Sequence, residues 1–69
     1  MNKDWTRVYK TANNFEADIM SSVLEDNGIP NVKLDRKDSS YQNFGVIEIF
    51  VHQDYFGEAI EVITKVENE

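Results

Sequence analysis

Few residues in this chain have the types and spacing that catalysis or metal binding would need. The 69 residues include no cysteine and a single histidine, His52, which lies two positions before Asp54. His52 and Asp54 could form a dyad or part of a metal site, but catalysis needs convergent nucleophiles, bases or metal ligands. A pair at the junction of a strand and a helix has a simpler structural explanation. We therefore expect the protein not to be an enzyme and to bind no metal at these residues.

Two other groups of residues could hold an ion or a phosphate. Asp35 and Asp38 could touch a cation, but they lack the number of ligands and the glycine spacing of a calcium loop. Gly45 and Gly57 stand alone, so the chain has no glycine-rich phosphate-binding loop. The sequence therefore predicts no cofactor, and a small-molecule ligand is left as an alternative without a motif.

The charge of the chain limits its partners. The formal net charge is −6 at pH 7, and the segments Asn13 to Asn27 and Asp54 to Glu69 each carry −4, which leaves +2 for the other residues. Tight binding to phosphate backbones or anionic lipids needs clustered Lys and Arg. The sequence therefore argues against nucleic acid and membrane partners. No apolar run is long enough for a signal peptide or for a membrane span of roughly 20 residues, and we expect a cytoplasmic protein.

The apolar residues predict two amphipathic helices. Asn13 suits the N-cap of the first, and Glu16 is placed to complete a capping box. The apolar residues that follow have the spacing of one helix face: Phe15, Ile19, Met20, Val23 and Leu24. The second helix is expected to begin after Asp54 as its cap. Its apolar stripe comprises Phe56, Ala59, Ile60, Ile63 and Val66.

The segment Gly28 to Pro30 predicts the end of the first helix. Gly28 can take the left-handed conformation that closes a helix, after which Ile29 can fold back on Leu24. Pro30 cannot continue the helical hydrogen bonds. Elsewhere, β-branched and aromatic residues and the alternation of apolar with polar residues predict strands. The three expected strands are Thr6 to Thr11, Asn31 to Asp35 and Gly45 to His52.

The resulting order, β-α-β-β-α, predicts an α+β fold in a single domain of residues 1–69. Two one-sided helices must bury their stripes on one face of one sheet, which gives a two-layer sandwich. A right-handed crossover, with the third strand between the first two, gives a three-stranded antiparallel sheet. This is a ferredoxin-like arrangement without its usual fourth strand. The first strand then lies at a sheet edge that a second chain or a peptide could extend.

The face of the sheet away from the helices is expected to carry aromatic residues. One assignment of the strand faces puts against the helices Val8, Val32, Leu34, Ile47, Ile49 and Val51. The opposite face then carries Trp5, Arg7, Tyr9, Lys33, Val46, Glu48 and Phe50. A solvated antiparallel face is normally polar, and aromatic residues with Arg are typical of interface hot spots. We therefore take Trp5, Arg7, Tyr9 and Phe50 as a candidate interaction surface. Reversing the first strand would bury Trp5 and Tyr9 instead, and cross-strand pairs that only stiffen the sheet are an alternative.

The connection between the second and third strands is longer than chain reversal requires. Hairpin loops usually have two to five residues, whereas about ten, Asp35 to Phe44, show no strand or helix period here. Tyr41 and Phe44 could anchor this segment to the domain or reach a partner. We add both residues to the candidate interaction surface.

Four stretches distributed along the chain carry a family resemblance. They are VYKT (Val8 to Thr11), FEA (Phe15 to Ala17), LEDNGIP (Leu24 to Pro30) and FVHQDYFGEAIEVI (Phe50 to Ile63). Together they resemble a family of small prokaryotic domains of unknown function described as putative signal-transducing proteins. The resemblance implies a cytoplasmic, non-enzymatic regulatory domain with a fold like that of the nitrogen-regulatory PII proteins. Nucleotide sensing is not implied, because the long loop and nucleotide-binding motifs of a true PII protein are missing.

These observations give two functional hypotheses. The first is a small regulatory or signal-transducing domain that acts by binding a partner through the open sheet face and the loop between strands two and three. The second is a structural homo-oligomer that associates through the sheet face or the edge of the first strand. A standard stable interface buries about 1,600 Å² in total, which is demanding for a chain of this size.

Overall fold

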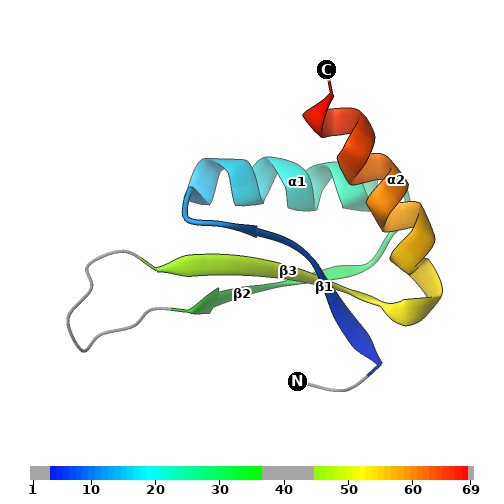
Figure 1. Ribbon diagram of the computed structural model, residues 1–69, viewed down its shortest axis with the longest axis horizontal. Coiled ribbons are helices and arrows are strands. Elements are labelled where there is room, and N and C mark those ends of the chain that lie inside the picture. The colour runs from blue at the N-terminus through cyan, green and yellow to red at the C-terminus, as the bar shows by residue number, and fades with distance from the viewer. Residues whose placement is uncertain (1–3, 37–44, 69) are drawn as a thin grey trace.

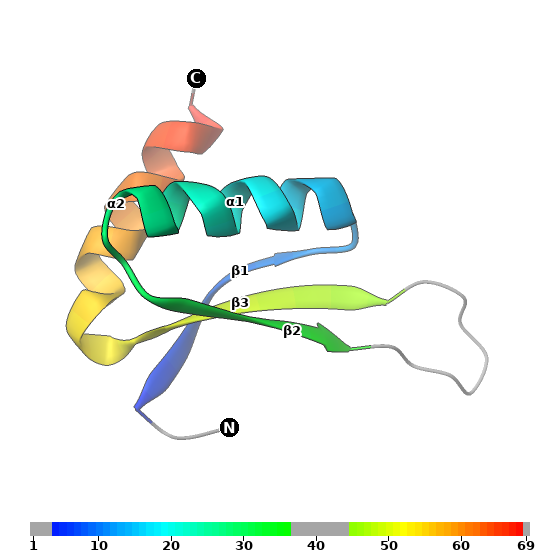
Figure 2. The ribbon, with the colours of Figure 1, turned by 180° about the vertical axis from the view of Figure 1, so that it is seen from behind.

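The computed structural model describes residues 4–36 and 45–68. The elements follow in the order β1 (Trp5–Thr11), α1 (Asn14–Asp26), β2 (Asn31–Arg36), β3 (Val46–His52), the 3-10 helix η1 (Gln53–Tyr55) and α2 (Phe56–Glu67). Both α-helices lie on the same side of the sheet (Figures 1 and 2). The predicted α+β order and the one-sided helical layer are therefore confirmed.

The sheet has the strand order β1-β3-β2, and both pairs are antiparallel. The predicted insertion of the third strand between the first two is correct. β1 and β2 are thus the two edges of the described sheet, and β3 is the central strand. This is the connectivity of a small ferredoxin-like sandwich, with three strands among the residues that the structure describes.

The core lies between the sheet and the helices. Its best buried large side chains are Leu24, from α1, and Ile49 and Val51, from β3. The remaining buried members of the cluster are Met20, Ile29, Ala59 and Ile63. Ile49 and Val51 belong to the same buried cluster as side chains of both helices, and this packing shows which side of β3 faces the helices.

The start of α1 is capped as predicted, but through a different network. The Asn13 side chain accepts hydrogen bonds from the backbone N–H groups of Phe15 and Glu16, at 2.8 and 3.1 Å. The Glu16 carboxylate does not return to Asn13 as a capping box would require. It accepts instead from the Thr11 hydroxyl at 2.9 Å, and that hydroxyl accepts from the Asn13 N–H at 3.1 Å. The Thr11 hydroxyl at the end of β1 therefore bridges Glu16 and the Asn13 N–H, and it links the strand to the helix.

The end of α1 follows the predicted glycine motif. Gly28 has φ +74° and is the one described residue whose φ is positive. The N–H of Ile29 donates to the Leu24 carbonyl at 2.9 Å, and the Ile29 side chain is buried in the core with Leu24. The left-handed glycine thus turns the chain so that Ile29 returns to the core and β2 can start at Asn31.

The buried face of α1 differs from the predicted stripe. Its buried residues are Ala17, Met20 and Leu24, whereas Phe15 and Ile19 are exposed. Positions i, i+3 and i+7 define a helix face as well as the predicted spacing does. The fully buried Ala17 lies on this face, and Phe15, which is 71% exposed, lies away from it.

The second helix also buries only part of its predicted stripe. Ala59 and Ile63 are buried and Val66 is partly buried, but Phe56 and Ile60 are exposed. The predicted cap is also wrong, since Asp54 lies within η1. The side chain that caps η1 is His52, whose Nδ1 accepts from the Asp54 N–H at 3.1 Å.

Candidate functional site

The strand registers define the sheet face that the helices leave uncovered. Ile47, Ile49 and Val51 point toward the helices, as predicted, so Val46, Glu48 and Phe50 point the other way. Residues directly opposite one another in neighbouring strands share a face. The uncovered face, called here the open face, therefore comprises Trp5, Arg7, Lys10, Val32, Leu34, Arg36, Val46, Glu48, Phe50 and His52.

The predicted facing of β2 is wrong. Val32 lies opposite Phe50, and Leu34 lies opposite Glu48, so both belong to the open face. Lys33 lies opposite Ile49 on the helix side, where its ammonium group forms an ion pair with Asp18 of α1. Because β2 is an edge strand, a lysine on its helix side can keep its charge in water while its stem covers apolar surface.

The predicted facing of Tyr9 is also wrong, and a β-bulge is the reason. Arg7 lies opposite Phe50 and Tyr9 lies opposite Ile49, which leaves Val8 as the extra residue of β1. Tyr9 therefore packs against the core from the helix side, while Trp5 and Arg7 stay on the open face as predicted. Burial raises the pKa of the Tyr9 phenol above its ordinary value, and the carboxylates of Glu16 and Glu67 raise it further.

Glu48 is the centre of a charged cluster on the open face. Its side chain is mostly buried, with 7% of the residue exposed. Oε2 accepts from Arg7 Nη1 at 2.7 Å, and Oε1 accepts from Arg36 Nε. The hydrogen bond from Arg7, together with the bond and charge of Arg36, holds the pKa of Glu48 below its ordinary value, although desolvation opposes this. Lys10 lies directly opposite Glu48 in the register.

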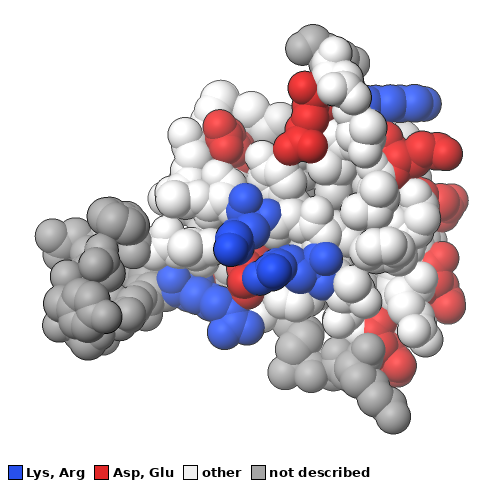
Figure 3. All heavy atoms as spheres, in the orientation of Figure 1, with Lys and Arg blue, Asp and Glu red and all other residues white. Residues whose placement is uncertain are grey.

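The charge distribution on this side of the molecule is visible in space-filling view. Figure 3 shows Lys and Arg side chains gathered around one acidic side chain near the middle of the view, while other acidic atoms lie toward its top and right. Arg7, Lys10, Arg36 and Glu48 together carry +2 in a chain whose net charge is −6. The open face therefore has the opposite charge to the rest of the molecule.

The aromatic residues of the open face differ in accessibility. The Trp5 ring meets the His52 ring edge-on, with centroids 5.8 Å apart and planes at 86°. Phe50 is only 8% exposed, flanked in the sheet by Arg7 and Val32. Phe50 is thus a packing residue of the open face and not the contact residue that we expected. The exposed apolar residue is Val32, which is 37% exposed.

His52 has a local structural role. Its Nδ1 accepts the Asp54 N–H, so the ring proton of this neutral tautomer lies on Nε2. The Asp54 carboxylate lies 3.5 Å from the same Nδ1, but a nitrogen that accepts a hydrogen bond cannot also donate one to the carboxylate. The His52 side chain therefore caps the start of η1.

Two of the predicted surface residues, Tyr41 and Phe44, lie outside the described residues, as does Asp38. Asp35 lies in β2 as predicted, and Arg36, which we expected in the loop, is the last residue of that strand. The sequence interpretation also missed Val32, Leu34 and Lys10 as members of the open face. Their placement depends on the bulge in β1 and on the facing of β2, which no local sequence pattern shows.

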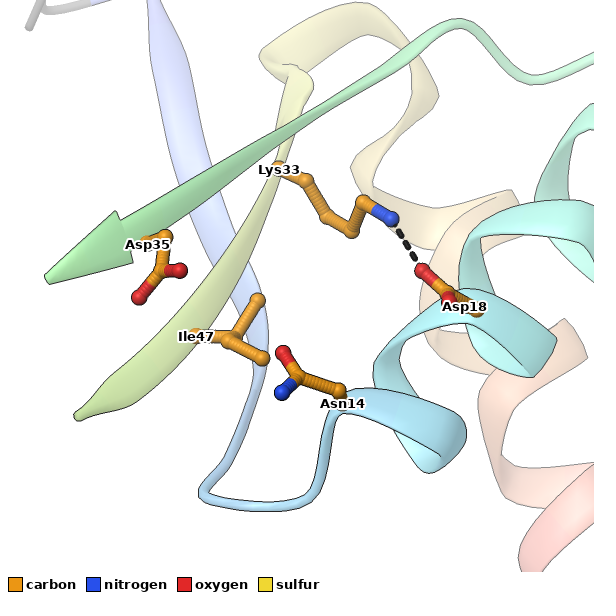
Figure 4. Close-up of a pocket in the computed structure, with 5 residues that line it drawn as sticks. All are labelled: Asn14, Asp18, Lys33, Asp35 and Ile47. Carbon is orange, nitrogen blue, oxygen red and sulfur yellow. Dashed lines mark hydrogen bonds and ion pairs between the residues drawn. The ribbon is translucent and has the colours of Figure 1, made fainter. Parts of the chain in front are cut away.

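A hollow of about 140 Å³ lies on the helix side, near the start of α1. It is lined by Asn14, Asp18, Lys33, Asp35 and Ile47, and Figure 4 shows the ion pair between Lys33 and Asp18 at its wall. Ligand pockets usually have about 300–1,000 Å³, so this hollow could accept only a few atoms. Within the described ranges, no three His, Cys, Asp or Glu side chains come together as candidate metal ligands.

None of the helices in the described part of the chain is long and apolar enough to cross a membrane. Comparison with known proteins shows the family of the chain. No significant match was found among curated proteins or among solved structures. A family model described as "Putative prokaryotic signal transducing protein" matches residues 5–67, which include every helix and strand of the structure. The chain therefore belongs to this family of prokaryotic domains.

Proposed function

We propose that this protein is a small regulatory domain that acts in the cytoplasm, without catalysis, by docking a partner protein on its open face. The family description points to signal transduction as the general role. Binding as the mode of action is supported by the chemistry of the site. The residues that catalysis would need do not converge among the described side chains, since His52 caps a helix start and the charged cluster is arranged around an internal carboxylate.

The observation that carries the proposal is the composition of the open face. A solvated antiparallel face is normally polar, but this one combines the exposed Val32 and the half-buried Trp5 and Leu34 with two arginines. Aromatic and Arg side chains are enriched at the centres of protein interfaces. The open face has this composition, whereas the helical layer buries its opposite side.

The segment between β2 and β3 is part of the proposed surface. Its ends are held together at one end of the open face, because Arg36 pairs with Val46 in the register. Residues 37–44, which include Tyr41 and Phe44, follow Arg36 in the chain and lie outside the described residues, and we propose that they contribute to partner binding.

Site-specific photocrosslinking in the cells that produce the protein would test this proposal. Val32 on the open face and Ile60 on α2 are matched probes, since they are 37% and 38% exposed. Benzoylphenylalanine at position 32 should give a crosslinked species of defined mass, and the same group at position 60 should not. Equal crosslinking from both positions, or none from position 32, would contradict the proposal.

Self-association is the second candidate, and the β1 edge is the feature that favours it. β1 has β3 on one side only among the described strands, so its outer backbone groups could pair with another chain. Its bulge at Val8 makes such pairing less regular. Face-to-face stacking of two open faces is opposed by their like charge. Sedimentation at micromolar concentration distinguishes the candidates, since a strict monomer rules out the oligomer.

A further inference from the structure

The charge of the open face narrows the kind of partner that it fits. Three cations, Arg7, Lys10 and Arg36, surround a single carboxylate there. The segments that form the helices each carry −4. Among the described residues, the open face therefore attracts an anionic group, whereas the net negative charge of the helical segments repels it.

Glu48 holds the two arginines in place without using all of their donors. A guanidinium group has five N–H donors in a fixed planar fork. The bonds to Glu48 use Nη1 of Arg7 and Nε of Arg36, and these arginine side chains are 50% and 61% exposed. Each guanidinium is thus anchored on one side by a buried carboxylate while its outer side remains in water. Because the guanidinium groups are already held in place, less side-chain conformational entropy is lost when a further anion binds.

The size of the positive charge favours carboxylates over a nucleic-acid backbone. The cluster carries +2, and further acidic side chains lie above it and to its right in Figure 3. A polyphosphate chain gains affinity by neutralising many phosphates at once, which a cluster of this size cannot do. A few carboxylates spaced along a peptide would be enough to meet the two arginines.

The apolar residues of the open face indicate which side chains of the bound peptide lie between its carboxylates. Val32 and Leu34 alternate with charged positions along β2, and Arg36 follows on the same face. Successive residues of an extended peptide point to opposite sides, so acidic and apolar side chains can both reach the open face along one segment. A compact inorganic anion would leave the apolar residues without a contact.

We propose that the open face binds an extended acidic peptide segment of a partner protein, in which carboxylates bond to the outer N–H groups of Arg7 and Arg36 and an apolar side chain covers Val32. This inference rests on the proposed function and assigns the chemistry of the partner. The bound carboxylates take the places that water now holds on the two guanidinium groups, and Glu48 keeps its own bonds to them.

Fluorescence anisotropy with synthetic peptides tests the assignment. The probe is a labelled peptide of Glu and Val residues, and the matched control peptide has Gln in place of every Glu. We expect the Glu peptide to bind at least about tenfold more tightly than the Gln peptide, because charge-assisted bonds are roughly twice as strong as neutral ones. Its affinity should fall as salt is raised, since the cluster is exposed.

Protein variants locate the site. Arg36→Gln should weaken the Glu peptide by about tenfold. Lys10→Gln should weaken the affinity for the Glu peptide about threefold. Because this change leaves both arginine bonds to Glu48 intact, it tests the site even if the arginine variant loses stability. Lys33→Gln is the matched control, because Lys33 lies on the helix side paired with Asp18, and it should bind like the wild type.

Three binding results would overturn the inference. They are equal affinity for the Glu and Gln peptides, unchanged affinity in both Arg36→Gln and Lys10→Gln, and stronger binding of a labelled RNA oligonucleotide to the same face. A stable dimer formed through the open face would also overturn it. If the charge dependence fails while crosslinking from position 32 succeeds, the proposed function stands and only the acidic nature of the partner is wrong.

Discussion

The same small substitution at two glycines should change the stability of this protein in opposite directions. Gly28 has φ +74° and closes α1, whereas Gly57 lies in the first turn of α2. A Cβ atom at either position would have no heavy atom within 4 Å outside its local chain neighbourhood. Contacts with the rest of the fold therefore contribute to neither change, and the backbone conformation alone sets the sign.

The expected magnitudes follow from those conformations. Alanine at position 28 must adopt the left-handed region, which costs about 1–2 kcal/mol for a residue with a Cβ. Alanine at position 57 reduces the backbone entropy lost on forming α2, which stabilises by about 0.5 kcal/mol. The two variants should therefore differ by about 2 kcal/mol, or roughly 8–16 °C in Tm for a domain of this size. Both should remain folded, since a core of this length supplies about 3–5 kcal/mol.

Thermal and urea unfolding followed by far-ultraviolet circular dichroism would measure the difference. Gly28→Asn is a useful third variant, because asparagine tolerates the left-handed region better than alanine and should recover part of the loss. The reasoning would be refuted if Gly28→Ala were as stable as the wild type, or if both alanine variants shifted Tm in the same direction.

Three further predictions concern the core and the two titrating groups. Ile49→Val should lower the free energy of unfolding by about 1 kcal/mol, whereas the same change at the exposed Ile60 should alter it by less than about 0.5 kcal/mol; urea unfolding that gave equal losses would contradict the assigned core. The folded pKa of Glu48 lies below its ordinary value of 4.5, so its contribution to stability is present above that pH and is lost as the pH falls through the lowered pKa. Acid unfolding of Glu48→Gln should therefore be less steep than that of the wild type, and identical profiles would count against the arginine bonds. The folded pKa of Tyr9 lies above 10.0, so its contribution is present below that pH and is lost as the pH rises through the raised pKa; Tyr9→Phe should lose less stability than the wild type under alkaline conditions, and an equal loss would mean that the phenol is not buried in the fold.

The two misassigned strand faces show where sequence patterns stop being decisive. Val32 and Leu34 alternate with Lys33 and Asp35, and this alternation predicts a strand but does not say which set is buried. The structure puts Val32 and Leu34 on the open face. β2 is an edge strand, and on its other side Lys33 forms an ion pair with Asp18 of α1. The alternation of apolar and polar residues within β2 does not show on which side of the strand α1 lies.

The bulge in β1 is a second feature that the local sequence does not reveal. Strict alternation would put Tyr9 with Trp5 and Arg7, but one extra residue shifts the register and turns Tyr9 toward the core. The bulge is favoured by the contacts that it permits, since both Val8 and Tyr9 then pack against the buried cluster. These are contacts with residues distant in the chain.

The sequence by itself determined the order of elements, the cap at Asn13, the end of α1 at Gly28 and the two-layer arrangement. Each of these features depends on interactions within a few residues or on the need to bury one apolar stripe. The local sequence pattern shows both kinds of cause. The tertiary structure alone decided which side chains share the open face and that Arg7 and Arg36 converge on Glu48. These residues belong to three different strands, and their meeting depends on strand order and register, which are set by packing across the whole domain.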